Sequence, residues 1–173
     1  MADDLAARIT QLEAQVRELN DRERIRDLRY RYHEYVNEGK GADIAALFTA
    51  DGAIDFGHLG KAQGHDQIAR FFRGIKDLAP EQQLEAVPRI TWIKQFIHNH
   101  VVEVHGDQAR GFAYLEAKPI FNGEAYLVAA RYDDEYVRSG AGWKFARMSL
   151  VPYFMVPLRE GWAQRDRLKM RPS

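Results

Sequence analysis

The first twenty residues carry apolar side chains at alternating intervals of four and three. This spacing repeats every seven residues and predicts a helix with one apolar stripe, formed by Leu5, Ile9, Leu12, Val16 and Leu19. Two heptads are too short for a stable free coiled coil, so we expect the stripe to pack on the body of the protein or on another subunit. Asn20-Asp21 favours a break there, with Asp21 near the start of a new helix.

Helical periodicity continues through the next fifty residues. A second helix is expected from about Arg22 to Asn37, because apolar positions recur along it every three or four residues, and Gly39 and Gly41 favour its end. The pattern then predicts three shorter elements: a helix over residues 42–48, a strand over 53–56 and a helix over 64–75.

The second half of the chain is rich in β-branched and aromatic residues, which favour strands. Four long strands are predicted, at residues 89–104, 109–120, 124–138 and 142–156. Gly106-Asp107 and Asn122-Gly123 suit tight hairpins, and residues 139–142 suit a longer connection. Strands this long twist and curl, and the helices of the first half can cover the concave face of their sheet.

These elements predict an α+β, cone-shaped domain whose curved antiparallel sheet and helices enclose one apolar pocket. We divide the chain into an N-terminal amphipathic helix at residues 1–20, a main domain at 21–160 and a C-terminal tail at 161–173. A chain of 173 residues fits one such core without disulfide or metal support.

Composition narrows the possible functions. Lys plus Arg and Asp plus Glu both number 25, and this balance argues against a nucleic-acid partner. The absence of cysteine excludes thiolate chemistry and cysteine-based metal sites. No apolar run suits a secretory signal or a membrane span, so we expect a cytoplasmic protein. No glycine-rich phosphate loop or serine elbow is present, so no nucleotide cofactor is expected.

Two histidines on the first long strand raise the question of a metal. His98 and His100 are two residues apart, so on a regular strand they share a face, opposite Gln95 and Asn99. Zinc would need at least a third ligand, and no carboxylate partner or HExxH pattern is evident. We therefore expect no metal site.

The sequence contains several short motifs that a known family also carries, in the same order. They are Ile25-Arg-Asp-Leu28, Ala46-Leu-Phe-Thr-Ala-Asp51, Gly64 at a helix start, His105-Gly-Asp107 and Gly142-Trp-Lys-Phe145. The sequence from Arg22 to Val156 resembles the SnoaL-like group of the nuclear transport factor 2-like (NTF2-like) superfamily. The resemblance implies the cone-shaped fold and, for enzymes of the group, no cofactor. That group includes cyclases, dehydratases, a dehydrochlorinase, a deformylating lyase of lignin-derived compounds, and binding proteins without catalysis.

The resemblance also exposes a departure. Dehydratase-type members carry an Asp at the end of the second helix and a His on the first long strand, and these positions correspond to Asn37 and Gln95 here. Neither amide titrates, so neither can act as a general base. Both can still orient a substrate or polarise an oxygen.

Other residues are the candidates for proton transfer. His33 lies one helical turn before Asn37 and shares its face, so it could replace the missing base. Tyr32 matches a pocket tyrosine of the bile-acid dehydratase branch and could donate to a leaving oxygen. His58 follows the short strand and shares a face with Ile54 and Phe56. Each also has an ordinary structural alternative: a surface histidine, a packed core tyrosine, or a turn histidine.

The predicted catalytic set is therefore His33, Tyr32 and His58. The predicted substrate-binding set is Asn37, Gln95, Phe56, Ile54, Asn99 and Tyr114.

Three functions remain open at this point. The first is a cofactor-independent lyase that dehydrates or deformylates a bulky aromatic or cyclic alcohol, of which a lignin-derived phenolic dimer is one example. The second is a small-molecule binding protein in which the amides mark a lost dyad. The third is an isomerase or cyclase that uses the same pocket. In each case the partner is an apolar or aromatic small molecule, with no membrane or nucleic acid, and the chain forms a homo-oligomer, a dimer or a trimer.

Overall fold

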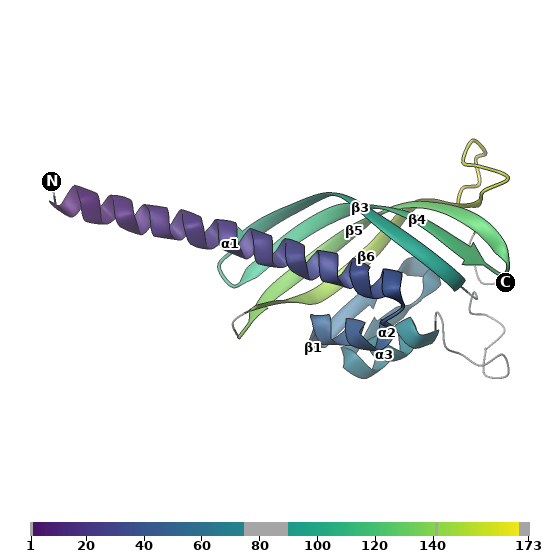
Figure 1. Ribbon diagram of the computed structural model, residues 1–173, viewed down its shortest axis with the longest axis horizontal. Helices are drawn as coiled ribbons and strands as arrows, with labels where there is room; N and C mark the ends of the chain where they lie inside the picture. Colours follow the sequence, from purple (N-terminus) through teal and green to yellow (C-terminus); the bar gives the residue numbers. More distant parts are fainter. Residues whose placement is uncertain (1, 75–89, 141, 170–173) are drawn as a thin grey trace.

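The computed structural model describes residues 2–74, 90–140 and 142–169. One long helix and a short helical pair come first, and a sheet with a further helix follows (Figure 1). The elements are α1 (Ala2–Glu38), α2 (Gly41–Ile44), η1 (Ala45–Leu47), β1 (Phe48–Asp55), η2 (Gly57–Leu59), β2 (Lys61–Gln63), α3 (Gly64–Gly74), β3 (Ile90–His105), β4 (Gln108–Phe121), β5 (Glu124–Ser139) and β6 (Gly142–Pro157).

The strands form one curved sheet in the order β2-β1-β6-β5-β4-β3. The four long strands pair antiparallel as a meander, as the sequence predicted. Gly106-Asp107 and Asn122-Gly123 make the two tight turns, and the positive φ angles of Asn122 (48°) and Gly123 (82°) suit such a turn. β1 pairs parallel with β6, so the sheet is mixed. The α+β class is confirmed.

The expected helix break at Asn20-Asp21 is wrong, because α1 runs without interruption from Ala2 to Glu38. The Asp21 carboxylate does not cap a helix. It accepts two hydrogen bonds from Arg138, at 2.9 and 2.7 Å, and one from the indole of Trp143 at 3.0 Å. No glycine or proline interrupts this stretch, so nothing in the backbone opposes helix. Gly39, with a φ of 77°, ends α1 as predicted.

The smaller elements differ in detail from the prediction. Residues 42–48 form α2 and η1 rather than one helix, and β1 begins at Phe48 and not at Ala53. The short strand β2 was not predicted. It pairs antiparallel with the end of β1. The predicted ends at residues 75 and 89 lie outside the described residues.

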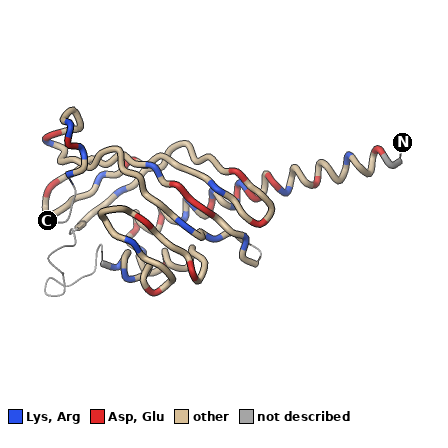
Figure 2. The backbone as a smooth tube through the Cα atoms, turned by 180° about the vertical axis from the view of Figure 1, so that it is seen from behind, with Lys and Arg blue, Asp and Glu red and all other residues tan. Residues whose placement is uncertain are grey.

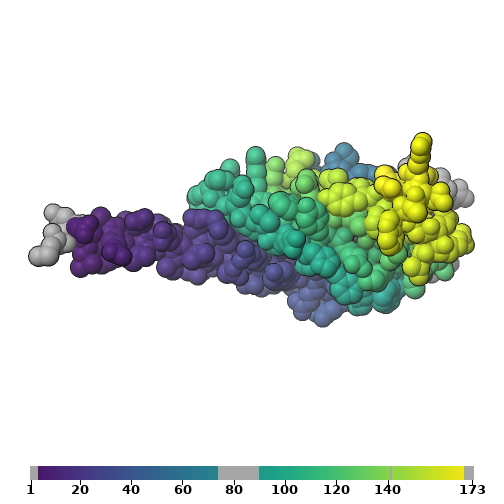
Figure 3. All heavy atoms as spheres, turned by 90° about the horizontal axis from the view of Figure 1, so that it is seen from above, coloured from purple at the N-terminus to yellow at the C-terminus, as the bar shows by residue number. Residues whose placement is uncertain are grey.

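The helices cover only one face of the sheet. The C-terminal half of α1 lies across the concave face, and α2 and α3 pack below it beside β1 (Figure 1). Gly41 permits the close approach of α2 to α3, because an added Cβ would lie 2.9 Å from the carbonyl oxygen of Phe72. Residues 4–20 of α1 are exposed and project from the body (Figure 3). Among the described helices, none is both long and apolar enough to cross a membrane.

Candidate functional site

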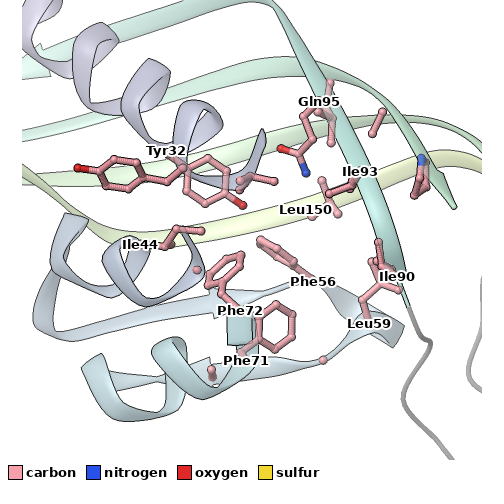
Figure 4. A pocket seen from close by; sticks show the side chains of 18 of the residues that line it. Tyr32, Ile44, Phe56, Leu59, Phe71, Phe72, Ile90, Ile93, Gln95 and Leu150 are labelled. Atoms are coloured by element: carbon pink, nitrogen blue, oxygen red, sulfur yellow. The ribbon is translucent and has the colours of Figure 1, made fainter. Parts of the chain in front are cut away.

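A cavity of about 460 Å³ lies between the concave face of the sheet, the end of α1, and the α2–α3 layer. Its wall is mostly apolar and aromatic, and Figure 4 shows side chains from all of these elements pointing into it. The apolar wall includes Ile44, Phe56, Leu59, Phe71, Phe72, Ile90, Ile93, Leu115, Val128, Leu150 and Met155. A cavity of this size and lining suits an apolar small molecule.

Three polar side chains of the lining lie together: Tyr32 of α1, Gln95 of β3 and Tyr132 of β5. The other described lining residues with polar or charged side chains are Tyr35, Lys61, Gln67 and Arg70. The two tyrosine hydroxyls are 3.4 Å apart, and the Tyr132 hydroxyl lies 3.5 Å from Oε1 of Gln95. Burial raises the pKa of Tyr32 well above its usual value and also raises that of Tyr132. Both hydroxyls are therefore protonated near neutral pH and can donate to an oxygen in the cavity.

His33 stands directly behind this group. Its Nδ1 lies 2.9 Å from Oε1 of Gln95, so Nδ1 carries the proton and donates it to the amide oxygen. Its Nε2 is buried and has no hydrogen-bond partner among the described residues. Burial, and then the nearby Arg29 charge, lower the pKa of His33 well below its usual value, so the ring is neutral at pH 7.

Asn37 holds the backbone of Gln95. Its Nδ2 donates to the Gln95 carbonyl at 2.9 Å, and its Oδ1 accepts from the Gln95 N–H at 2.7 Å. Asn37 is not among the described residues that line the cavity. The structure thus brings His33, Asn37 and Gln95 together, and of these three only Gln95 lines the cavity. Asn37 fixes its backbone and His33 its side chain.

The amide nitrogen of Gln95 remains available to a ligand. Both hydrogen bonds to this side chain end on Oε1, and no described residue bonds to its Nε2. Figure 4 shows the amide directed toward the cavity. Gln95 can therefore donate to a ligand oxygen while His33 and Tyr132 hold its own oxygen in place.

A buried ion pair, Arg29 with Asp134, lies behind the tyrosines and was missed by the sequence analysis. Both side chains are fully buried. The Arg29 guanidinium stacks on three aromatic rings, with its central carbon 4.4 Å from the ring centre of Tyr132, 4.8 Å from that of Phe145 and 5.1 Å from that of Tyr32. The Arg29–Asp134 pair thus packs against the rings of Tyr32 and Tyr132 and holds them in position.

The same pair continues into a second hydrogen-bond chain. The Tyr136 hydroxyl donates to Asp134 at 2.8 Å and accepts from Nε2 of His100 at 3.1 Å. Burial, followed by the charges of Arg29 and Arg26, lowers the pKa of His100 to about 3. His100 is therefore a neutral, structural donor at physiological pH.

The predicted common face of His98 and His100 is wrong. The β3–β4 pairing shifts register between His98 and Val101, and Asn99 has a φ of 47°. This bulge turns His100 inward to Tyr136, while His98 faces solvent within 4.0 Å of Glu116. Within the described part of the chain, no group of three or more His, Asp or Glu residues is arranged to hold a metal ion.

The remaining predicted residues are scattered. Phe56 lines the cavity, whereas Ile54 is buried in the core beside it. His58 is half-buried in η2, between Phe56 and Leu59 of the wall, and is not itself among the described lining residues. Asn99 is exposed on the bulge, and Tyr114 is 37% exposed on the outer face of the sheet. Neither is placed to contact a molecule in this cavity.

A strand-parity argument could have found the missed residues. Tyr132, Asp134 and Tyr136 alternate on the inward face of β5, and a carboxylate at such a position requires a cation. Arg29 lies between Ile25 and Tyr32 at helical spacing on the buried side of α1. An inward Arg and an inward Asp together predict an ion pair.

The sequence matches the SnoaL-like domain family over residues 17–149. An uncharacterized protein of Mycobacterium tuberculosis strain H37Rv is 26% identical over 136 residues, which are 76% of this chain and 85% of that protein. A protein of the same kind from Mycobacterium bovis matches equally.

Solved structures confirm the NTF2-like fold. An NTF2-like protein from Novosphingobium aromaticivorans has a TM-score of 0.65 and 26% identity, covering 83% of this chain and 89% of its own. A hexachlorocyclohexane dehydrochlorinase from Novosphingobium barchaimii has a TM-score of 0.70 and 19% identity, covering 83% and 94%. A candidate scytalone dehydratase from N. aromaticivorans has a TM-score of 0.67 and 17% identity, covering 84% and 91%.

Proposed function

Because this chain belongs to the SnoaL-like domain family, we propose that it is a cofactor-independent lyase acting on a bulky aromatic or cyclic alcohol. The reaction is an elimination that releases water or a small carbon fragment such as formaldehyde. A lignin-derived phenolic dimer is one substrate of this kind. Two of the solved structures with this fold are a dehydrochlorinase and a candidate dehydratase, which favours elimination over other chemistries as the first class to test.

One observation supports this proposal most strongly: a continuous polar chain reaches a mostly apolar cavity. It runs from His33, behind the wall, through Gln95 to the hydroxyls of Tyr132 and Tyr32. Two hydroxyl donors on the wall and an imidazole directly behind Gln95 are the groups that an acid–base elimination needs. The apolar remainder of the wall suits a bulky ring system.

In the dehydration, a C–H bond breaks and its proton passes to the His33 imidazole. The electron pair forms the new C=C bond as the C–O bond breaks, and the leaving oxygen takes a proton from Tyr32 to depart as water. The His33 imidazolium then gives its proton to the Tyr32 tyrosinate, across the space that the Gln95 side chain leaves when it turns. For His33 to act, the Gln95 side chain turns toward the substrate and leaves Nδ1 facing the cavity, with the imidazole proton on Nε2.

The lowered pKa of His33 restricts the substrate. A weakly basic imidazole removes only an activated proton, so we expect the C–H bond to lie next to a carbonyl group or an electron-poor ring. The Gln95 amide nitrogen and the Tyr132 hydroxyl would hold the activating oxygen. His58 remains the second candidate for the base, since η2 lies beside the cavity wall.

The test is mass spectrometry of products from a panel of phenolic, polycyclic and terpenoid alcohols, after treatment of the protein with a chelator. Loss of water or formaldehyde supports the lyase. The variants His33→Gln, His58→Gln and Tyr32→Phe then assign the roles. We expect His33→Gln and Tyr32→Phe to lower kcat roughly 100-fold or more, with folding checked by circular dichroism. Full turnover by both His33→Gln and His58→Gln would reject a histidine base.

A small-molecule binding protein is the second candidate. It is favoured by the group of Tyr32, Gln95 and Tyr132, because burial keeps both hydroxyls protonated and the amide carries no charge. The charged side chains of the described lining, Lys61 and Arg70, come from β2 and α3 instead. Retention of an apolar ligand through desalting, without any product, would support this function. An isomerase or cyclase would use the same groups, and a product of unchanged mass would identify it.

A further inference from the structure

The projecting part of α1 carries an apolar stripe that no described helix or strand packs against. Residues 4–20 are all exposed. The five stripe residues are 48–60% exposed: Leu5, Ile9, Leu12, Val16 and Leu19. A free helix of this length is marginal in water, and a contiguous apolar stripe on it is a contact surface without a partner.

The protein's own body cannot cover this stripe. Successive helical residues turn by about 100°, so Leu19 and Leu28, nine residues apart, point in directions about 180° apart. Leu28 is buried against the body, as are Asp21 and Ile25 on the same side of α1. The stripe therefore faces away from the sheet. Arg138 of the body lines a hollow together with Ile9, Leu12 and Val16, but these apolar side chains stay about half exposed. Of the two partners expected from the sequence, another subunit is therefore the one that can cover the whole stripe.

We propose that the stripe pairs with the same stripe of a second copy of this chain, as a parallel two-stranded coiled coil. In heptad notation the stripe places Ile9 and Val16 at the a positions, and Leu5, Leu12 and Leu19 at the d positions. β-branched residues at a together with leucine at d favour two parallel strands over three or four. The proposal does not depend on the chemistry of the cavity.

Charge at the flanking positions fits the parallel arrangement. Arg8 occupies a g position and Glu13 the following e position, and these are the positions that meet across a parallel dimer. Because the dimer is symmetric, the contact between Arg8 and Glu13 occurs twice. The next pair, Gln15 with Asn20, is uncharged and polar. An antiparallel pair would bring e against e and g against g, which removes both contacts between opposite charges.

The geometry of the body permits this pairing. Asp21 occupies an f position, on the outside of the coiled coil, and its contacts with Arg138 and Trp143 attach the body there. Two bodies would thus lie on opposite outer sides of the paired helices. A lipid surface suits the stripe less well, because acidic and basic residues both occur along the projecting part of α1 (Figure 2).

Cysteine cross-linking tests the pairing and its direction, because the chain contains no cysteine of its own. Leu5→Cys and Leu19→Cys should each form a disulfide-linked dimer alone under mild oxidation, since a parallel pair places each residue beside its copy. Ala14→Cys, at an f position on the outside of the pair, should form no disulfide-linked dimer. Linkage only in a mixture of the Leu5→Cys and Leu19→Cys proteins would indicate an antiparallel pair and overturn the proposal.

Sedimentation equilibrium over a range of concentrations tests the contact without cross-linking. We expect the native chain to approach twice the monomer mass at high concentration. Leu12→Asp should raise the dimer dissociation constant by about tenfold or more, while the matched control Ala14→Asp leaves it unchanged. Near-ultraviolet circular dichroism should report an unchanged body in both. A dimer or trimer that tolerates Leu12→Asp would overturn the proposal.

Charge reversal gives a test whose expected result could not come from a change in helix propensity alone. Arg8→Glu and Glu13→Arg should each weaken the dimer, because each puts like charges across the pair. The double variant Arg8→Glu/Glu13→Arg restores opposite charges and should recover native affinity. Equal affinity in all four proteins would reject the parallel register.

Discussion

Asn37 and Gln95 are joined by two hydrogen bonds, in which the amide side chain of Asn37 pairs with both the N–H and the carbonyl of the Gln95 backbone. The contact resembles the pairing of a neighbouring strand, but it is made by the end of a helix. It sets the distance between α1 and β3, and hence the position of the Gln95 side chain in the cavity wall.

Removing this contact should cost stability. Asn37→Ala leaves one N–H and one carbonyl of β3 without partners in a half-buried place, so we expect the free energy of unfolding to fall by about 1–3 kcal/mol. Urea denaturation would measure it. Gln11→Ala, on the exposed projecting part of α1, is the control and should change the free energy by less than about 0.5 kcal/mol.

The buried pair of Arg29 and Asp134 gives a second prediction. Arg29→Met or Asp134→Asn alone leaves an uncompensated buried group and should lower the free energy of unfolding by about 3–5 kcal/mol. The double variant Arg29→Met/Asp134→Asn removes both charges and should recover much of that loss. If the double variant is as unstable as the sum of the singles, the pairing is not what supports the tyrosines.

An exposed ion pair on the same strand supplies the comparison. Arg131 and Asp133 are each about two-fifths exposed and lie 3.0 Å apart. Asp133→Asn should change the free energy of unfolding by less than about 1 kcal/mol. A loss equal to that of Asp134→Asn would contradict the role of burial.

His33 and His100 predict the pH dependence of stability. Their pKa values are lowered on folding, to about 3 for His100, from an ordinary value of 6.5. Below pH 6.5 the unfolded chain binds protons that the folded chain does not, so stability is fully present above that pH and falls as the pH drops toward 3. Each histidine contributes a slope of up to about 1.4 kcal/mol per pH unit.

His98 and His100 make a matched pair for this measurement. Urea denaturation between pH 6.5 and 4 measures how the free energy of unfolding changes with pH. In His100→Gln this slope should be smaller than in the native protein by up to about 1.4 kcal/mol per pH unit. His98→Gln makes the same substitution at an exposed position of the same strand and is the matched control. Equal slopes in all three proteins would mean that His100 is not buried in solution.

Filling the cavity should block ligands while preserving the fold. Ala117 lines the cavity from β4, and its neighbour Glu116 faces outward. Ala117→Phe should weaken the binding of an apolar fluorescent probe at least about tenfold, whereas Glu116→Phe should not. Fluorescence titration checks both. Unchanged binding by Ala117→Phe would place the probe elsewhere.

The strands could be predicted from the sequence because their evidence is local. Asn122-Gly123 determines a turn by its own backbone preference, and the alternation along residues 124–138 places Tyr132 inward with no other information. The position of Gln95 in the wall was expected instead from the resemblance to the SnoaL-like group. The parallel pairing of β1 with β6 depends on contacts about a hundred residues apart, and no local pattern indicates it.

Each wrong prediction can be traced to particular residues. Asn20-Asp21 has the composition of a helix start, but tertiary contacts of Asp21 with Arg138 outweighed that preference. Asn99 tolerates a positive φ angle, and one such residue reversed the facing of every later position on β3, including His100. The role of Asn37 could not be foreseen, because an amide at a catalytic position gives no sign that it bonds to backbone rather than to substrate.

The continuity of α1 has a mechanical consequence. Asp21 divides the helix into a free arm, residues 2–20, of roughly 28 Å and a packed arm, residues 22–38, of roughly 25 Å, and its bonds to Arg138 and Trp143 hold the helix at the point between them. A sideways load on the free arm passes through an unbroken rod into the packed arm, where the buried Arg29–Asp134 pair and then the bonds from Asn37 to Gln95 resist it. Force applied to the free end of the protein is thus carried toward the groups that support the polar corner of the cavity.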